Sequence, residues 1–298
     1  MLDPQLLYTV DPDVRDSLRG EHPVLIHQLD GYIDAGAVTR DTRLYLLEQC
    51  DHEVVAQFDV DQLHDYRSRR PQFVFDTNHW ASMSEFALTM WKATDANGTP
   101  FLLFGGPEPD SQWRRAAAAV MALAQELDVS QFVTAAAVPM AVPHTRPTLV
   151  TSHSTDPELV SGNPIWIDKV QLPGSFSHML EFRAGEAGIL GRGFVAHVPH
   201  YLSQTVFPQA IIEVLHRIQV ATGLAFPLAE LEELSVQNQL TIAKETADDT
   251  DFPTLVAALE EQYDRLRDSG AASVPSADEI GAAVEQFLAE QEPPDYPR

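Results

Sequence analysis

The stretch VLIHQLDGYIDAG, residues 24–36, gives the first clear indication of the fold class. Its beginning, Val24–Leu29, is rich in large aliphatic residues and predicts a buried strand. A turn containing Asp30 and Gly31 follows, and the segment 35–49 predicts a helix that begins at once. A strand, a glycine turn, an acid and a helix in this order are typical of a ligand loop in a doubly wound α/β protein.

The same alternation continues over the first 200 residues. Further strands are predicted at 54–60, 101–104, 132–138 and 194–198. Further helices are predicted over 111–127, with Asp110 as N-cap, and across Pro208 to a stop at Gly223. The segment 72–91 predicts short antiparallel strands, followed by a turn at Asp95–Gly98. Repeated strand–helix–strand units predict an α/β fold with a largely parallel sheet and helices on both faces.

The chain changes character after residue 224. Residues 225–298 contain 17 acidic and 4 basic residues and therefore carry −13 of the net charge of −25. Only helical patterns occur there, over 228–244, 253–267 and 277–290, and Ser276 with Glu279 forms a capping-box pattern before the last of them. We therefore predict an α/β domain over residues 1–224 and an acidic helical segment over 225–298 that packs on its outside.

The composition excludes several classes of partner. A net charge of −25 argues against nucleic acid, because affinity for phosphates depends on cationic side chains. The first residues lack the basic and apolar regions of a secretory signal, and no apolar run approaches the ~20 residues that span a bilayer. The single cysteine, Cys50, cannot form an internal disulfide. We expect a soluble cytoplasmic protein that binds neither nucleic acid nor membrane.

Polar residues gather in the four loops that follow the predicted strands. In open α/β sheets, ligands bind outside the carboxyl ends of the strands. Since such a sheet brings these loops to one edge, we expect Asp34 to share a polar cleft with His144. The residues predicted for this cleft are Asp34, Gly36, Glu108, His144, Arg146, His197 and His200.

Each of these residues also has a structural interpretation. Asp34 is placed to interact favourably with a helix dipole, and Gly36 suits a tight turn and close packing of a helix on a strand. Arg146 is suited to gripping a carboxylate or phosphate, and equally to a structural salt bridge. His197 and His200 have a spacing that metals use, but the sequence fixes no third ligand, so we expect no metal.

Signatures of a cofactor or of a nucleophile are weak. Gly31 and Gly36 lack the Lys-Ser/Thr pair of a phosphate loop and the third glycine of a dinucleotide fingerprint, so we expect no cofactor. The sequence has no Gly-x-Ser-x-Gly elbow. Cys50 stands beside Asp51 at a predicted helix end, where the pKa of its thiol should be raised and its reactivity low.

A basic cluster, Arg67, Arg69 and Arg70, follows Asp65 and Tyr66 on this acidic chain. It offers a contact for an anion, and it equally suits salt bridges between elements or between subunits. We predict that these arginines make oligomer or anion contacts.

Five segments in order resemble the proteasome assembly chaperone 2 family: LDGYIDAGAV (29–38), DYRSRRP (65–71), GPEPDSQW (106–113), VPHTRP (142–147) and HVPHYL (197–202). The likeness covers residues 24–223 and is closest to the bacterial branch, which carries a helical C-terminal extension. The resemblance implies a three-layer α/β/α sandwich like that of phosphorylases and peptidyl hydrolases. It also implies a homo-oligomer, with a trimer as the expected form.

The resemblance favours a function without catalysis. Eukaryotic relatives are non-enzymatic chaperones of proteasome α-subunits, and some end in a hydrophobic–Tyr–any tripeptide that docks into the proteasome. Here the chain ends Tyr296-Pro297-Arg298, with the tyrosine one place too early, so this docking route is not implied. We expect an assembly chaperone or scaffold whose partners are itself and another protein assembly. The alternative is a small-molecule-binding enzyme of phosphorylase or hydrolase type that uses the polar cleft.

Overall fold

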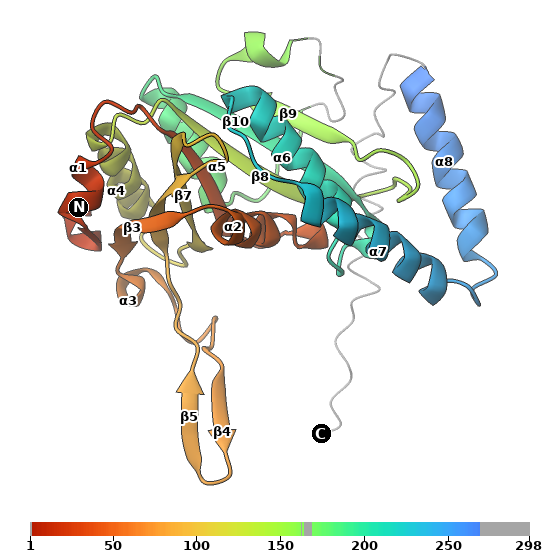
Figure 1. Ribbon diagram of the computed structural model, residues 1–298, viewed down its shortest axis with the longest axis horizontal. Coiled ribbons are helices and arrows are strands. Elements are labelled where there is room, and N and C mark those ends of the chain that lie inside the picture. The colour runs from red at the N-terminus through yellow and green to blue at the C-terminus, as the bar shows by residue number, and fades with distance from the viewer. Residues whose placement is uncertain (1, 162, 164–168, 269–298) are drawn as a thin grey trace.

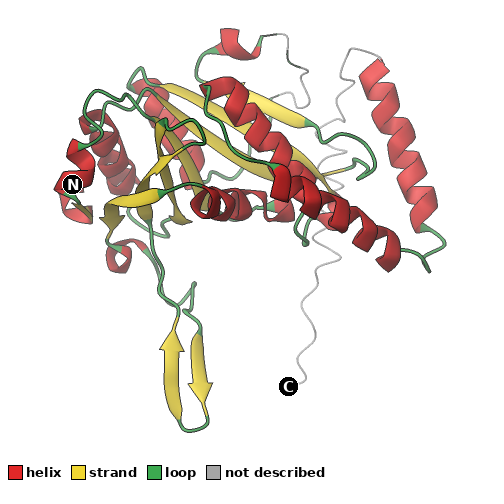
Figure 2. Cartoon of the chain, viewed as in Figure 1, coloured by secondary structure: helices red, strands yellow, loops and turns green. Residues whose placement is uncertain are grey.

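One mixed sheet forms the centre of the molecule (Figures 1 and 2). The computed structural model describes residues 2–161, 163 and 169–268. Within these residues the eight-stranded sheet has the strand order β1-β3-β6-β7-β2-β8-β10-β9. Its strands are β1 (Tyr8–Val10), β2 (Val24–Asp30), β3 (His52–Phe58), β6 (Thr89–Thr94), β7 (Pro100–Pro107), β8 (Gln131–Met140), β9 (Val150–Ser154) and β10 (Leu190–Pro199).

The middle of the sheet is parallel and its edges are antiparallel. Neighbouring strands pair in parallel through the series β7, β2, β8 and β10. β3 points the same way, because β6 is antiparallel both to β3 and to β7. The outermost strands, β1 and β9, run against their neighbours. The prediction of an α/β fold with a largely parallel sheet is thus confirmed.

Helices cover both faces of the sheet and complete three layers (Figure 2). One face packs against α2 (Val38–Gln49) and α6 (Pro208–Thr222), and the other against α4 (Trp113–Glu126) and α5 (Phe176–Glu186). The short helical elements are η1 (Pro4–Leu7), α1 (Pro12–Asp16), η2 (Ala35–Ala37), α3 (Val60–Leu63), η3 (Pro157–Val160) and η4 (His200–Leu202). After the sheet come α7 (Ala229–Glu245) and α8 (Phe252–Asp268).

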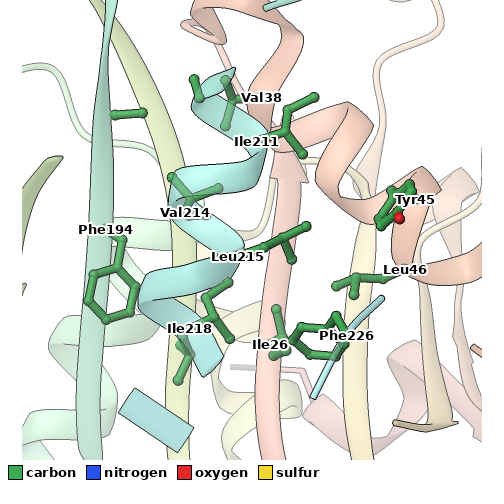
Figure 3. Packing of buried hydrophobic residues seen from close by; sticks show 14 of the residues in the cluster. Ile26, Val38, Tyr45, Leu46, Phe194, Ile211, Val214, Leu215, Ile218 and Phe226 are labelled. Atoms are coloured by element: carbon green, nitrogen blue, oxygen red, sulfur yellow. The ribbon is translucent and has the colours of Figure 1, made fainter. Parts of the chain in front are cut away.

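Apolar periodicity on α6 builds the core of the first face (Figure 3). Val214, Leu215 and Ile218 lie on its inner side and are fully buried. They pack in one cluster with Ile26 of β2 and Phe194 of β10. Complete burial of a side chain of this size contributes about 1.5–3 kcal/mol, so this stripe holds α6 against the sheet.

A partly buried ion pair ties α2 to the neighbouring strands β2 and β7. The guanidinium of Arg43 donates to both carboxylate oxygens of Asp30, at 2.7 and 3.0 Å, and also to the backbone oxygen of Gln28. To reach them, the arginine stem crosses Gly105, where an added Cβ would lie only 2.2 Å from Cδ of Arg43. Gly105 lies inside β7, because the strand continues to Pro107. The predicted strand end at Phe104 was therefore too early.

Two helix starts differ from the prediction because of left-handed backbone. α2 begins three residues later than expected, since Gly36 and Ala37 have φ values of 67° and 55°. α4 follows Gln112, which has a φ of 56° and does not cap the helix with its side chain. The prediction of Asp110 as the N-cap of α4 was therefore wrong.

The segment 72–91 forms antiparallel strands, as predicted. β4 (Phe73–Asp76) and β5 (His79–Met83) make a separate two-stranded hairpin, and β6 joins the main sheet. The predicted turn is confirmed too, because Asp95 accepts hydrogen bonds from the backbone of Asn97 and Thr99. The helix α5 was not predicted, since its exposed Phe182 interrupts any simple apolar stripe.

The helices after Gly223 match the predicted positions of the first two C-terminal helices. Leu231 and Ile242 of α7 are buried. The third predicted helix, 277–290, its capping pattern and the C-terminal tripeptide lie outside the described residues. The division of the chain at residue 224 stays a prediction. Among the described residues, no helix has the length and apolar character needed to cross a membrane.

Gly105→Ala should lower the free energy of unfolding by about 3 kcal/mol, because the methyl group would displace Arg43 and separate a largely buried charge from Asp30. Gly174→Ala is the matched control, since a Cβ there meets no atom within 4 Å. Urea unfolding followed by circular dichroism measures both variants. Equal midpoints would contradict the role given to the ion pair.

Candidate functional site

Asp34 follows β2 and caps α2 from a distance. Its carboxylate accepts hydrogen bonds from the backbone N–H groups of Thr39, at 2.7 Å, and Arg40, at 3.0 Å. These groups need an acceptor because Ala37, at the N-cap position, has no polar side chain. Burial raises the pKa of Asp34, while the two backbone hydrogen bonds act in the opposite direction. Asp34 therefore has the helix-start role that was the alternative to ligand binding.

Gly36 joins the loop after β2 to the loop after β10. Its N–H donates to the backbone oxygen of Ser203 at 2.9 Å, and its carbonyl accepts from the N–H of Phe207 at 3.1 Å. A Cβ at this position would lie 2.9 Å from Cβ of Phe207, and the φ of 67° also favours glycine. Glycine is required here by close packing of two loops.

Glu108 follows β7 and caps α5. One carboxylate oxygen accepts from the backbone N–H of Phe176 at 2.8 Å. The side chain is buried beside Gly31, where a Cβ would lie 3.7 Å from the carboxylate. Burial raises the pKa of Glu108, against the lowering effects of the Phe176 hydrogen bond and of Arg69. The loop after β7 thus positions α5, which lies on the face of the sheet opposite to α2.

His144 lies in the loop between β8 and β9, under the C-terminal helices. Its Nδ1 lies 2.9 Å from the hydroxyl oxygen of Tyr201, which also accepts from the backbone N–H of His144 at 3.0 Å. The imidazole stacks on the ring of Phe252 of α8, with centroids 5.9 Å apart. Burial lowers the pKa of His144 and so favours the neutral ring.

Arg146 binds two carboxylates, those of Glu260 and Asp264, and both residues belong to α8. It forms a two-pronged contact with Asp264, at 3.0 and 2.8 Å, and a third hydrogen bond of 3.0 Å to Glu260. Thr145 donates to Glu260 as well, and Tyr263 donates its hydroxyl to the carbonyl of Pro147. Of the two interpretations of Arg146, the structure shows the salt bridge.

His197 and His200 lie in different environments. His197 is 2% exposed, with Nε2 2.8 Å from the hydroxyl of Thr151, and burial lowers its pKa to about 4. His200 is exposed, and its ring centroid lies 5.3 Å from that of Tyr201. Within the described part of the chain, no group of three or more His, Cys, Asp or Glu side chains is arranged to hold a metal ion.

One arginine of the basic cluster makes an ion pair within the protomer, and the other two are exposed. Arg69 pairs with Asp110 at 2.8 Å, which joins the 65–71 loop to the segment before α4. Arg67 and Arg70 are exposed. Their use as oligomer or anion contacts stays a prediction.

The loop after β10 touches both groups of predicted residues. It meets Gly36 through Ser203, and it meets His144 through Tyr201. No hydrogen bond or ion pair among the described residues joins Asp34 to His144 or Arg146. A common cleft therefore stays a prediction.

Four residues that build this region were not predicted from the sequence: Tyr201, Phe252, Glu260 and Asp264. Tyr201 stands within HVPHYL, but its partner was not apparent. Glu260 and Asp264 are four residues apart and so share one helix face, which was the available signal. Their distance of more than 100 residues from Arg146 hid the contact.

A family model and several solved structures match this chain. The family model described as the PAC2 family matches residues 28–245. A protein of unknown function from Mycobacterium tuberculosis is 41% identical, with a TM-score of 0.82 over 88% of this chain and 90% of that one. A second, from Corynebacterium glutamicum, is 35% identical, with a TM-score of 0.81 over 87% and 97%.

A more distant structure shows the same fold. It is a proteasome-assembly chaperone homologue from Mycobacterium tuberculosis, 23% identical, with a TM-score of 0.72 over 79% of this chain and 99% of that one. A comparison with curated proteins finds no match.

Arg146→Gln should loosen α8, because it removes the ion pairs with Glu260 and Asp264. We expect amide hydrogen exchange in 252–268 to become roughly tenfold faster, while α6 is unchanged. Arg217→Gln is the control, since Arg217 pairs with Glu213 inside a single helix. Unchanged exchange in α8, measured by mass spectrometry, would show that the apolar contacts alone hold it.

Proposed function

The chain belongs to the PAC2 family, and we propose that it is a non-catalytic assembly or scaffold protein that binds itself and another protein assembly. The observation that carries this proposal is the hairpin β4–β5, which extends away from the body of the molecule (Figure 1). Every residue of its two strands is exposed. The large apolar side chains are Phe73, Val74, Phe75, Trp80 and Met83, with exposed fractions of 47–66%.

A hairpin of this kind needs a partner surface. Two strands alone are marginally stable in water, and exposed clusters of apolar residues mark protein contacts. Trp80 packs edge-to-face against Phe73 and Phe75, with ring centroids 5.5 and 5.0 Å apart. These contacts stiffen the hairpin and leave its aromatic faces available. Exposed Arg67 and Arg70 precede it, and arginine with aromatic residues is the composition of binding hot spots.

We assign the hairpin to self-association in a homotrimer. If the hairpin of one copy enters a different surface on the next, the contact is heterologous, and a rotation of one third of a turn between copies would close it into a ring of three. The protomer has a net charge of −25, so copies repel each other over most of their surface. Arg67 and Arg70 would offset this repulsion by pairing with acids of a neighbour.

The comparisons support an assembly role in a general form. One structural relative is named a proteasome-assembly chaperone homologue. The polar residues at the strand ends support a role without catalysis, because Asp34, Glu108 and Arg146 are engaged with helices of the same chain. We further propose a cytoplasmic location, with residues 225–298 acting as a unit packed on the α/β domain.

Replacing Phe75 and Trp80 together by serine should dissociate the oligomer, raising its dissociation constant by at least about 100-fold, the scale expected for hot-spot residues. Val220→Ser is the matched control, because Val220 is 88% exposed on α6. Light scattering at micromolar concentration gives the masses, and circular dichroism confirms folding. A wild-type protein of monomer mass, or a double variant of wild-type mass, would refute self-association through the hairpin.

The second candidate is a small-molecule-binding enzyme of phosphorylase or hydrolase type. It is favoured by Glu108 and His197, which are buried at the carboxyl ends of strands with a raised and a lowered pKa, respectively.

A thermal-shift screen with a panel of phosphorylated and carboxylated metabolites separates the two candidates. Glu108→Gln is the informative variant, since its amide oxygen keeps an acceptor for the N–H of Phe176 and only the charge is lost. The scaffold proposal predicts no metabolite whose stabilising effect disappears in Glu108→Gln. His216→Gln is the control, because His216 is exposed on α6. A metabolite that stabilises the wild type and His216→Gln but not Glu108→Gln would favour the enzyme.

A further inference from the structure

An unpaired imidazole lies on the sheet face that α5 covers. His27 of β2 is 0% exposed, and neither of its ring nitrogens has a hydrogen-bond partner among the described residues. Side chains alternate along a strand, so His27 shares a face with Leu25 and Leu29, which belong to the core under α4 and α5. α5 also packs directly against β2. A positive charge on His27 would have no hydrogen-bond acceptor among the described residues, and the carboxylate that would favour it is that of Glu181 on α5.

The first turn of α5 also requires a neutral histidine. In the capping box that begins this helix, Ser175 accepts from the N–H of His178, and Nδ1 of His178 accepts from the N–H of Ser175 at 3.1 Å. A nitrogen that accepts a hydrogen bond carries no proton, so the ring is neutral with its proton on Nε2. Protonation of Nδ1 would replace this acceptor by a donor facing another donor.

We propose that α5 is an acid-sensitive element whose N-terminal half leaves the sheet when His27 and His178 become protonated. The two histidines act in the same direction from opposite sides: one lies beneath the helix, and the other closes its first turn. Opening this half would expose Phe176 and Leu180, which are fully buried when the helix is docked. Acid would thereby create an apolar surface that the closed protein lacks.

The direction of the pH effect follows from the burial of His27 and from the capping hydrogen bond that Nδ1 of His178 accepts. Burial lowers the pKa of His27 from 6.5 to about 4. Desolvation at the start of α5 lowers the pKa of His178 as well, although its side chain remains exposed to water on one side. In the open state both rings return toward the ordinary value. The docked state therefore has its full stability above about pH 6.5 and loses it as the pH falls toward 4.

Charged groups around these histidines limit how far the helix opens. Glu181 of α5 faces both, and its partner is His153 of β9, 2.8 Å away. Although burial alone would raise the pKa of Glu181, the His153 hydrogen bond and the neighbouring histidines lower it. Glu181 thus stays ionised in mild acid and holds the middle of α5 at β9.

Glu108 acts against opening. Burial raises its pKa in the docked state, so its protonation in mild acid favours the closed helix. Its own charged neighbours are Arg69 and Asp110. In mild acid, opening is therefore driven by the two histidines alone. At a pH below the usual range of carboxylate pKa values, protonation of Glu181 would add to it.

Hydrogen exchange of the whole chain tests the proposal. Protection factors, which remove the intrinsic pH dependence of exchange, are compared between about pH 7.5 and about pH 5 for 176–186 and for α6. The shift of one histidine from 6.5 to about 4 predicts a loss of protection of roughly 30-fold in α5. α6 should keep its protection, because it packs on the other face of the sheet.

Two variants remove the response without removing the helix. His178→Gln keeps a capping-box acceptor that does not titrate, and His27→Leu places an apolar side chain in the apolar core. Each variant should reduce the pH-dependent loss, and the double variant should abolish it. His216→Gln is the control at an exposed histidine.

Three results would overturn the inference. They are equal protection of α5 at both pH values, an equal loss in α6, and a His178→Gln variant that responds like wild type. The last result decides even if His27→Leu does not fold, because His178 is exposed at the helix start and its replacement conserves the cap.

Discussion

The partly buried pairing of Arg43 with Asp30 fixes how α2, β2 and β7 meet at the carboxyl edge of the sheet. A guanidinium cannot lose its charge in the interior, so it must find an acceptor, and the acceptors are at the end of β2. The arginine stem lies on Gly105, which holds β7 and α2 in one fixed arrangement. The loop after Asp30 then starts from a fixed point beside Glu108, and Glu108 in turn caps α5. One charge therefore links the helix layers on the two faces.

Polar side chains in the loops at this edge share a common role, which is to attach helices to the sheet. Asp34 caps α2, Glu108 caps α5, and Arg146 holds α8. Asp34 and Glu108 accept from N–H groups at helix starts, and Arg146 pairs with carboxylates of α8. A doubly wound sheet provides these loops for ligands in many enzymes, and the same chemistry here stabilises the protein itself. Acids and arginines after parallel strands are therefore ambiguous until their partners are known.

The buried apolar cores and the exposed apolar residues of the hairpin lie in different parts of the molecule. Its apolar side chains fill two cores on either side of the sheet, where complete burial gives the stabilisation. The hairpin β4–β5 contributes to neither core, yet it concentrates large apolar and aromatic residues in water. Such a distribution is unfavourable for an isolated protomer, which is the physical basis for assigning a partner to this arm.

Local chemistry was enough to predict the α/β class, the strand at 24–29, the turn at Asp95 and the end of α6 at Gly223. Apolar periodicity and turn residues act over a few neighbours, so these features are present in the sequence itself. Four features could not be predicted from such short-range patterns: the start of α2, the missing cap of α4, the helix α5 and the carboxylates that bind Arg146. They depend on left-handed residues such as Ala37, and on contacts between segments more than 100 residues apart. Long-range packing selects those conformations and partners, since the same residues would be equally compatible with other neighbours.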